Sequence, residues 1–137
     1  MHDSKQRTIF LIEDNRTENI LLKLSLNSFK NIKVHTFVNG HELLNSINLN
    51  PDIVIVDLNL PDIQGYELIK LIKEYSSGIY IVVVSSQKDI EVIAKTQELG
   101  IFNYIVKNEG CLKHLKTIIQ DILVLIDYKE SKQSTEE

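Results

Sequence analysis

The sequence alternates five short runs of apolar, largely β-branched residues with segments whose apolar residues recur at helical spacing. The runs around Val54 and Val82 are nearly continuous in apolar character, which is typical of strands buried on both faces of a parallel sheet. The run at 32–37 alternates more with polar residues, so we expect it at an edge of the sheet. The five predicted strands cover residues 8–12, 32–37, 52–58, 79–84 and 103–106.

Each predicted strand is followed by apolar residues at steps of three or four, as in a helix that faces a core. Strands that alternate with helices predict right-handed crossovers and a doubly wound α/β fold with a parallel sheet. The residues with helical spacing are Ile20, Leu21, Leu24 and Leu26; Leu43, Leu44 and Ile47; Leu68, Ile69, Leu71 and Ile72; Ile90, Ile93, Ala94 and Gln97; and Leu112, Leu115, Ile118, Ile119, Ile122 and Ile126.

The chain of 137 residues has the length of one domain and can bury a sufficient core without disulfides. We expect flexible residues 1–7, a folded domain over 8–127 and a flexible polar tail over 128–137. A net charge of −4 argues against direct nucleic-acid binding, and no apolar stretch is long enough for a membrane span. Cys111 is the single cysteine, which excludes an internal disulfide and favours a cytoplasmic location.

Polar residues stand where four of the predicted strands end, and parallel strands bring such ends to one edge. Crowded carboxylates repel one another, and a hard divalent cation such as Mg²⁺, which prefers oxygen ligands, relieves that repulsion. Zinc is less suitable because no histidine or cysteine ends these strands. The residues at the strand ends are Glu13 and Asp14, then Asp57 with Asn59, then Ser85 and Ser86, and finally Lys107.

Each of these residues also has a purely structural interpretation. Asp14 is suited to cap the following helix, Lys107 to form a surface ion pair, and Ser85 to bond a backbone group. An acid directly after the apolar run IVIV, as Asp57 is, is unusual as a structural residue. The combination of all of them at one edge therefore favours a phosphoryl site over separate structural roles.

From about Thr8 to about Ile126, the chain resembles the receiver domain of two-component response regulators. This resemblance implies a flavodoxin-like (βα)5 fold with strand order 2-1-3-4-5. The matching residues are the acidic pair Glu13 and Asp14 in FLIEDN; the phospho-acceptor Asp57, Pro61 and Gly65 in DIVIVDLNLPDIQGYELI; Ser85 and Ser86 in IVVVSSQ; and the switch residue Tyr104 and Lys107 in NYIVKN.

The resemblance implies a phospho-acceptor signalling domain rather than an enzyme with an external substrate. A histidine kinase or a histidine phosphotransfer protein would present phosphohistidine, and the Asp57 carboxylate would attack it in line. Mg²⁺, or Mn²⁺ in its place, would be held by Asp14, Asp57 and the backbone carbonyl of Asn59. Glu13 would act as a ligand directly or through water, while Lys107 would neutralise charge on the phosphoryl oxygens.

The resemblance also implies a conformational switch. Ser85, with Ser86 beside it, would bind the phosphoryl group, and the movement of Ser85 would leave space into which Tyr104 turns. The face formed by the fourth helix, the fifth strand and the fifth helix would then change and control a partner or an attached output domain. Asn59 and Gln87 are suited to tune dephosphorylation by orienting water, or they are solvated loop residues.

Two residues depart from the family pattern. Asn108 stands where the family usually has a proline joined by a cis bond, which for a non-proline residue costs about 3–4 kcal/mol. Either that strain is present here, or the bond is trans and the loop holds Lys107 differently. Ser85 replaces the more common threonine and keeps the hydroxyl group.

Three other functions fit parts of the sequence. A degenerate receiver acting as a protein-binding scaffold is supported only by Asn108. An aspartyl phosphatase of the haloacid-dehalogenase kind needs a second aspartate where Asn59 stands. A flavin-binding electron carrier needs a Ser/Thr-rich phosphate loop after the first strand, where this chain has the acidic sequence EDNRTEN.

The last predicted helix contains five consecutive apolar residues, 122–126, more than one buried stripe uses. Two explanations are open. Some of them contact a partner, such as a second copy in a homodimer, or they form an apolar helix end without a partner. For Cys111, near the start of this helix, we favour a small buried thiol.

Overall fold

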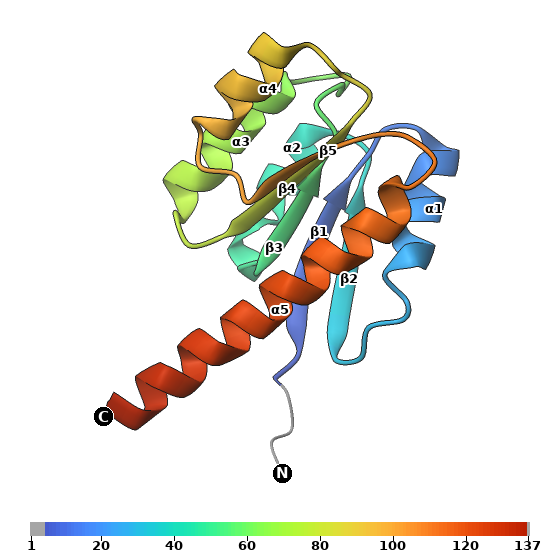
Figure 1. Ribbon diagram of the computed structural model, residues 1–137. Helices are drawn as coiled ribbons and strands as arrows, with labels where there is room; N and C mark the ends of the chain where they lie inside the picture. Colours follow the sequence, from blue (N-terminus) through green and yellow to red (C-terminus); the bar gives the residue numbers. More distant parts are fainter. Residues whose placement is uncertain (1–4, 137) are drawn as a thin grey trace.

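The computed structural model describes residues 5–136, and the side chains of residues 5–133. Strands and helices alternate along the chain, and a short 3₁₀ helix, η1, precedes the third strand (Figure 1). The elements are β1 (Arg7–Ile12), α1 (Arg16–Ser25), β2 (Ile32–Phe37), α2 (Gly40–Asn45), η1 (Ile47–Leu49), β3 (Ile53–Val56), α3 (Gly65–Tyr75), β4 (Tyr80–Ser85), α4 (Ile90–Gln97), β5 (Asn103–Val106) and α5 (Cys111–Glu136).

The five strands form one parallel sheet in the order β2-β1-β3-β4-β5, which confirms the predicted topology. The sheet is built outward in both directions from β1, so the strand order reverses between β1 and β3. β2 lies at one edge and is only partly buried, as its alternating sequence predicts. In contrast, β3 is buried at every residue.

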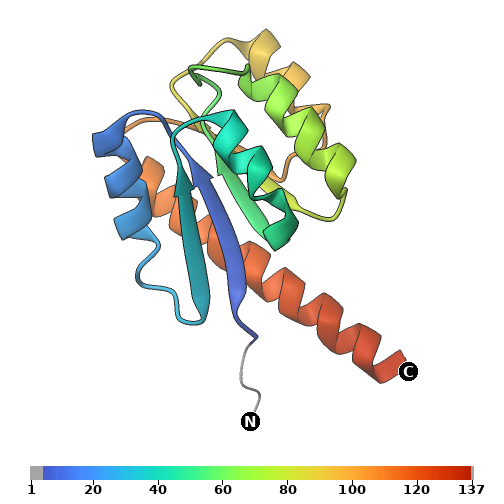
Figure 2. The same cartoon turned by 180° about the vertical axis from the view of Figure 1, so that it is seen from behind.

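Helices cover both faces of the sheet, with α1 and α5 on one face and α2, α3 and α4 on the other (Figures 1 and 2). Successive strand residues point to opposite faces. Ile9 and Leu11 of β1 therefore join the core under α1 and α5, whereas Phe10 and Ile12 join the core under the other three helices. Because all five strands are parallel, their carboxyl ends lie together at one edge of the sheet.

Several residues that helical spacing assigns to the core are exposed instead. In α1, the phase of the helix is set by Asn19, whose side-chain amide donates to the backbone carbonyls of Glu13 and Phe37 at 2.9 and 3.3 Å. This places Asn19 and Leu22 inward and leaves the other apolar side chains facing solvent. The predicted core residues that are exposed are Ile20, Leu21, Leu24, Leu71, Ile90, Ala94 and Gln97.

The structure places secondary structure at both ends of the predicted domain, whose flexibility stays a prediction. β1 begins at Arg7, within the predicted flexible segment 1–7, whose residues 1–4 lie outside the described part. The predicted flexible tail 128–137 is helical as far as Glu136, because α5 continues past the sheet. Arg7 connects these two segments by binding Asp127 at 2.7 Å and Glu130 at 2.8 Å.

Within α5, the apolar residues 122–126 are mostly covered, since Ile122, Leu123 and Ile126 pack in or against the core. Val124 is the one of the five that is exposed, at 57%. Cys111 is half-buried rather than buried as predicted. Between residues 5 and 136, no helix has both the length and the hydropathy that a membrane crossing requires.

Candidate functional site

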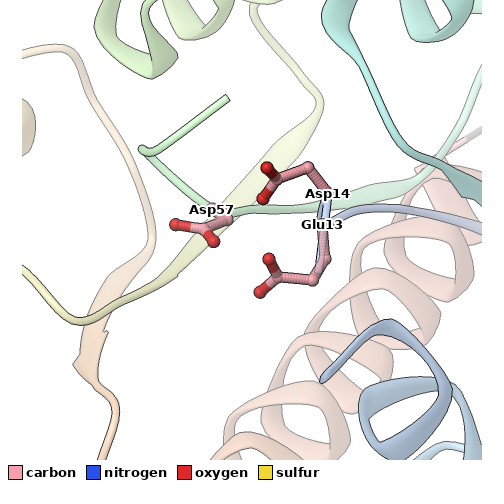
Figure 3. A group of neighbouring side chains, drawn as sticks. All are labelled: Glu13, Asp14 and Asp57. Carbon is pink, nitrogen blue, oxygen red and sulfur yellow. The ribbon is translucent and has the colours of Figure 1, made fainter. Parts of the chain in front are cut away.

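Three carboxylates meet where β1 and β3 end. Glu13 and Asp14 follow β1, and Asp57 follows β3, held beside β1 by its backbone N–H, which donates to the carbonyl of Ile12 at 3.1 Å. One oxygen from each carboxylate lies within 4.8 Å of the others, and Figure 3 shows the three side chains directed at a common space. The predicted gathering of Asp14 and Asp57 is therefore present in the structure.

Asp57 is 4% exposed, and both of its carboxylate oxygens accept hydrogen bonds. Oδ1 accepts from the backbone N–H of Asn59 at 3.1 Å, and Oδ2 accepts from Lys107 Nζ at 3.1 Å. The loop after Asp57 then packs tightly on the start of α3. A Cβ at Gly65 would lie 2.6 Å from Leu58 Cα, so only glycine fits this close approach.

Lys107 reaches across the edge of the sheet from β5 and donates to three carboxylates. Its Nζ lies 2.7 Å from Glu13 Oε1, 2.7 Å from Glu18 Oε2 and 3.1 Å from Asp57 Oδ2. An ammonium group has three N–H donors, so these three contacts use all of them. The sequence places Lys107 at the same edge as Glu13 and Asp57, but it gives no indication of the contact with Glu18.

The peptide bond between Lys107 and Asn108 is trans, as are all the peptide bonds within residues 5–136. Of the two alternatives for Asn108, the trans peptide bond is the one observed. The side chain of Asn108 accepts from the backbone N–H of Gly110 at 3.0 Å, and its carbonyl accepts from Cys111 N at 3.1 Å. Asn108 thus forms the turn that starts α5.

Negative charge exceeds positive charge in this cluster. Burial, and secondly the neighbouring Asp57, raise the pKa of Glu13 to about 8, although Lys107 acts in the opposite direction. Burial also disfavours the charged form of Lys107, but its three carboxylate partners hold the pKa of the ammonium above its ordinary value. The pKa of Glu13 is thus raised even though Lys107 is hydrogen-bonded to it, and a further cation in this space would favour its charged form.

The donor set fits a hard divalent cation. Three carboxylates converge on one space, all the donors are oxygens, and one carboxyl has a raised pKa that a cation would lower. No histidine or cysteine belongs to the acidic group found among the described residues. Mg²⁺ or Mn²⁺ therefore matches the cluster better than zinc.

The hydroxyl and aromatic residues lie on the neighbouring strands. Ser85 is buried at the end of β4, and its Oγ accepts from the backbone N–H of Gln87 at 3.2 Å. The exposed Ser86 accepts from the Asn59 side-chain amide at 3.5 Å. Tyr104 is already turned inward at 8% exposure, and its hydroxyl donates to the carbonyl of Gln87 at 2.9 Å. The side chain of Gln87 itself lies in an exposed loop.

Comparison with known proteins agrees with this geometry. Residues 9–120 match the model of the response regulator receiver domain. The chain is 32% identical to the transcriptional regulatory protein CssR of Bacillus subtilis, over 90% of this chain and 54% of CssR. It is 26% identical to a protein-glutamate methylesterase/protein-glutamine glutaminase of Geobacter sulfurreducens, over 83% of this chain. It spans only 31% of that protein, whose named activity is therefore not assigned to it.

Among solved structures, the phosphorylated cyanobacterial phytochrome response regulator RcpA is 26% identical, with a TM-score of 0.69. The match covers 90% of this chain and 93% of RcpA. The family match extends over all five strands and the first part of α5, and it includes the acidic cluster and Lys107. The chain therefore belongs to the response regulator receiver domains of two-component systems.

Proposed function

We propose that this receiver accepts a phosphoryl group from a phosphohistidine partner onto Asp57, in the presence of Mg²⁺, and that this changes the face formed by α4, β5 and α5. The observation that carries the proposal is the environment of Asp57. Its carboxylate is 4% exposed, lies beside two further carboxylates, and accepts a hydrogen bond from Lys107. The partner is a histidine kinase or a histidine phosphotransfer protein.

In the transfer step, one oxygen of the Asp57 carboxylate forms a bond to phosphorus as the phosphorus–nitrogen bond of phosphohistidine breaks. The electron pair of that bond goes to the imidazole nitrogen, and the ring leaves as neutral imidazole because its other nitrogen carries a proton in the phosphohistidine. The backbone N–H of Asn59 and the ammonium of Lys107 hold the two carboxylate oxygens in place for this attack. The product is an acyl phosphate on Asp57.

Charge stabilisation comes from residues at the ends of four strands. Glu13, Asp14 and Asp57 are the side chains that would hold Mg²⁺, with the Asn59 carbonyl as a further candidate ligand. A bound Mg²⁺ would neutralise negative charge on the phosphoryl oxygens. Lys107 does the same from β5, and Ser85, with Ser86 beside it, supplies hydroxyl donors from β4.

The link to the output face runs through Tyr104 on β5. Its hydroxyl bonds the Gln87 carbonyl in the loop before α4, and the N–H of the same residue bonds Ser85 Oγ. If Ser85 turns towards a phosphoryl group, the hydrogen bond to Gln87 is lost and the loop is released. The positions of α4 and Tyr104 are thereby coupled to the state of Asp57.

RcpA, which is 26% identical, supports this proposal because its structure is that of a phosphorylated response regulator. The scaffold alternative rests on Asn108, yet the trans loop at that residue still delivers Lys107 to Asp57. The phosphatase alternative requires an acid at residue 59, and the side chain there is an amide. Asn59 and Gln87 remain our candidates for tuning the lifetime of the phosphorylated form. The cytoplasmic location stays a prediction.

The experiment is phosphorylation with acetyl phosphate and Mg²⁺, followed by intact-mass measurement. We expect the wild type to gain the mass of one phosphoryl group and Asp57→Ala to gain none. The matched control is Asp121→Ala, an exposed aspartate on α5, which should be modified like the wild type. A wild type that stays unmodified, or an Asp57→Ala variant that is modified equally, would overturn the proposal.

A further inference from the structure

We propose that Glu18 of α1 is a positioning residue that holds the ammonium of Lys107 in competition with the phosphoryl group, and so limits the rate at which Asp57 is phosphorylated. This inference rests on the function proposed above. Its structural basis is the 2.7 Å contact between Glu18 Oε2 and Lys107 Nζ, which joins the first helix to the end of β5.

The start of α1 leaves the Glu18 side chain available for this contact. Asn15 is the N-cap, its side chain accepts from Glu18 N, and Glu18 is therefore the third helical residue. A glutamate at this position commonly folds back to accept the backbone N–H of the N-cap residue. Here that N–H donates to Glu13 Oε2 at 3.2 Å instead, and Glu18 extends to Lys107.

The hydrogen bonds of Lys107 create the competition. Its three N–H groups already serve Glu13, Glu18 and Asp57, so a phosphoryl oxygen obtains a donor only if one carboxylate gives it up. The Glu13 and Asp57 side chains are 1% and 5% exposed, whereas that of Glu18 is 43% exposed. Water can replace the lysine at Glu18 but not at the two buried carboxylates, so Glu18 is the partner that releases it.

Two substitutions separate the contact from the charge. Glu18→Asp keeps the negative charge on α1 but shortens the side chain by one methylene, so that it no longer reaches Lys107 Nζ. Glu18→Gln removes the charge and leaves only a neutral acceptor, which binds an ammonium less strongly. If the contact limits the reaction, both variants are faster than the wild type. A pure effect of charge would accelerate Glu18→Gln alone.

The matched control is Glu109→Gln. Glu109 lines the same surface hollow of about 280 Å³ as Glu18 and Lys107, so this variant removes an equal charge beside the lysine. We expect phosphorylation by acetyl phosphate at saturating Mg²⁺ to be about three- to tenfold faster in Glu18→Gln and Glu18→Asp, the range for a partly exposed charge-assisted contact. Glu109→Gln should stay within about twofold of the wild type, because Glu109 is exposed and water and salt screen its charge.

A second measurement reports the contact without metal or phosphodonor. In the wild type, the ¹⁵N resonance of Lys107 Nζ, assigned by its loss in Lys107→Arg, should show slow hydrogen exchange at mildly acidic pH. Exchange should be faster in both Glu18 variants and unchanged in Glu109→Gln. If the wild type is phosphorylated but the Glu18 variants show the same hydrogen exchange at Lys107 and the same phosphorylation rate as the wild type, the role of Glu18 is overturned and the proposed function is not. A wild type that takes up no phosphoryl group would overturn the proposed function and this inference together.

Discussion

Both edges of the sheet hold a cation among carboxylates, the buried Arg7 at one and the partly buried Lys107 at the other, but the two groups differ in charge balance. At the edge where the strands begin, which we call the amino edge, Arg7 binds Asp127 and Glu130, whose side chains are 55% and 48% exposed. We call these three residues the amino-edge ion pair. Because water solvates the two carboxylates and one guanidinium is shared between them, the surplus charge costs little.

At the carboxyl edge, one ammonium faces more carboxylates, and two of these are almost fully buried. We call this group, which consists of Glu13, Asp14, Glu18, Asp57 and Lys107, the carboxyl-edge cluster. Neither water nor Lys107 neutralises all of it, and the pKa of Glu13 is raised by its burial and, secondly, by the neighbouring Asp57. The comparison teaches that a surplus of carboxylates costs little where water reaches them, whereas a larger surplus that is buried leaves a cluster that favours a further cation.

The largest expected effect is a pH dependence caused by Glu13. Its pKa is about 8 in the folded state against 4.5 for the free side chain, so the folded protein binds this proton more tightly. The stability that Glu13 contributes is complete below pH 4.5 and is lost as the pH rises to about 8. Relative to Glu13→Gln, we expect metal-free wild type to lose on the order of 3 kcal/mol over this range.

Urea unfolding at several pH values, with a chelator present, measures this difference. Added Mg²⁺ should remove it, because a cation favours the ionised carboxylate. If the free energies of unfolding of wild type and Glu13→Gln keep a constant difference from pH 5 to pH 8, the cluster does not favour a further cation as we describe.

The second prediction removes the cation of the amino-edge ion pair. Arg7→Ala should lower the free energy of unfolding by about 2–3 kcal/mol, since it deletes charge-assisted hydrogen bonds and a buried side-chain stem. Its phosphorylation at Asp57 should match that of the wild type, because the two edges of the sheet are far apart along β1. Lys113→Ala, exposed on α5, is the control for loss of a positive charge. A loss below about 0.5 kcal/mol would show that the pair contributes no more than a typical surface pair.

The third prediction is that removing a carboxylate from the carboxyl-edge cluster stabilises the metal-free protein. Asp57→Asn should raise the stability of the metal-free protein by about 1–2 kcal/mol at pH 8, because it removes one of several repelling carboxylates. Mg²⁺ should stabilise the wild type more than this variant, so that the gap narrows or inverts. The corresponding change at the amino edge, Asp127→Asn, should destabilise the protein, and the size of this effect should depend neither on raising the pH to 8 nor on adding Mg²⁺. Thermal unfolding with and without Mg²⁺ distinguishes these outcomes.

Most of the fold follows from the sequence because strands and helices alternate with different apolar periods. The bounds of β2 and β5 were predicted to the residue. The residues of α1 and α4 that face the core were not predicted correctly, because in each helix a polar residue determines which side faces inward. In α1 it is Asn19, and in α4 it is the buried Thr96, whose hydroxyl donates to the Val92 carbonyl at 2.6 Å.

The site was predictable to the extent that strand ends meet at one edge. The acidic triad and Lys107 were found in this way, but a lysine's choice among several carboxylates depends on side-chain geometry. Glu18 was therefore missed, although its position in the first turn of the helix that follows Glu13 and Asp14 is a usable signal. The trans bond at Asn108 was left open by the sequence, because residue identity there sets only the cost of the cis form.

The smallest expected effect tests whether the amino-edge ion pair has the opposite pH dependence. A hydrogen bond from Arg7 lowers the pKa of Glu130, so its contribution is present above pH 4.5 and is lost as the pH falls through the lowered value. Glu130→Gln should cost about 0.5–1 kcal/mol at pH 7, as expected for a carboxylate that is half exposed. This difference from the wild type should disappear in acid, whereas that of Glu13→Gln changes as the pH rises. Urea unfolding of both variants over one pH series would reveal the two slopes, and slopes of equal sign would mean that the two edges do not differ in charge balance.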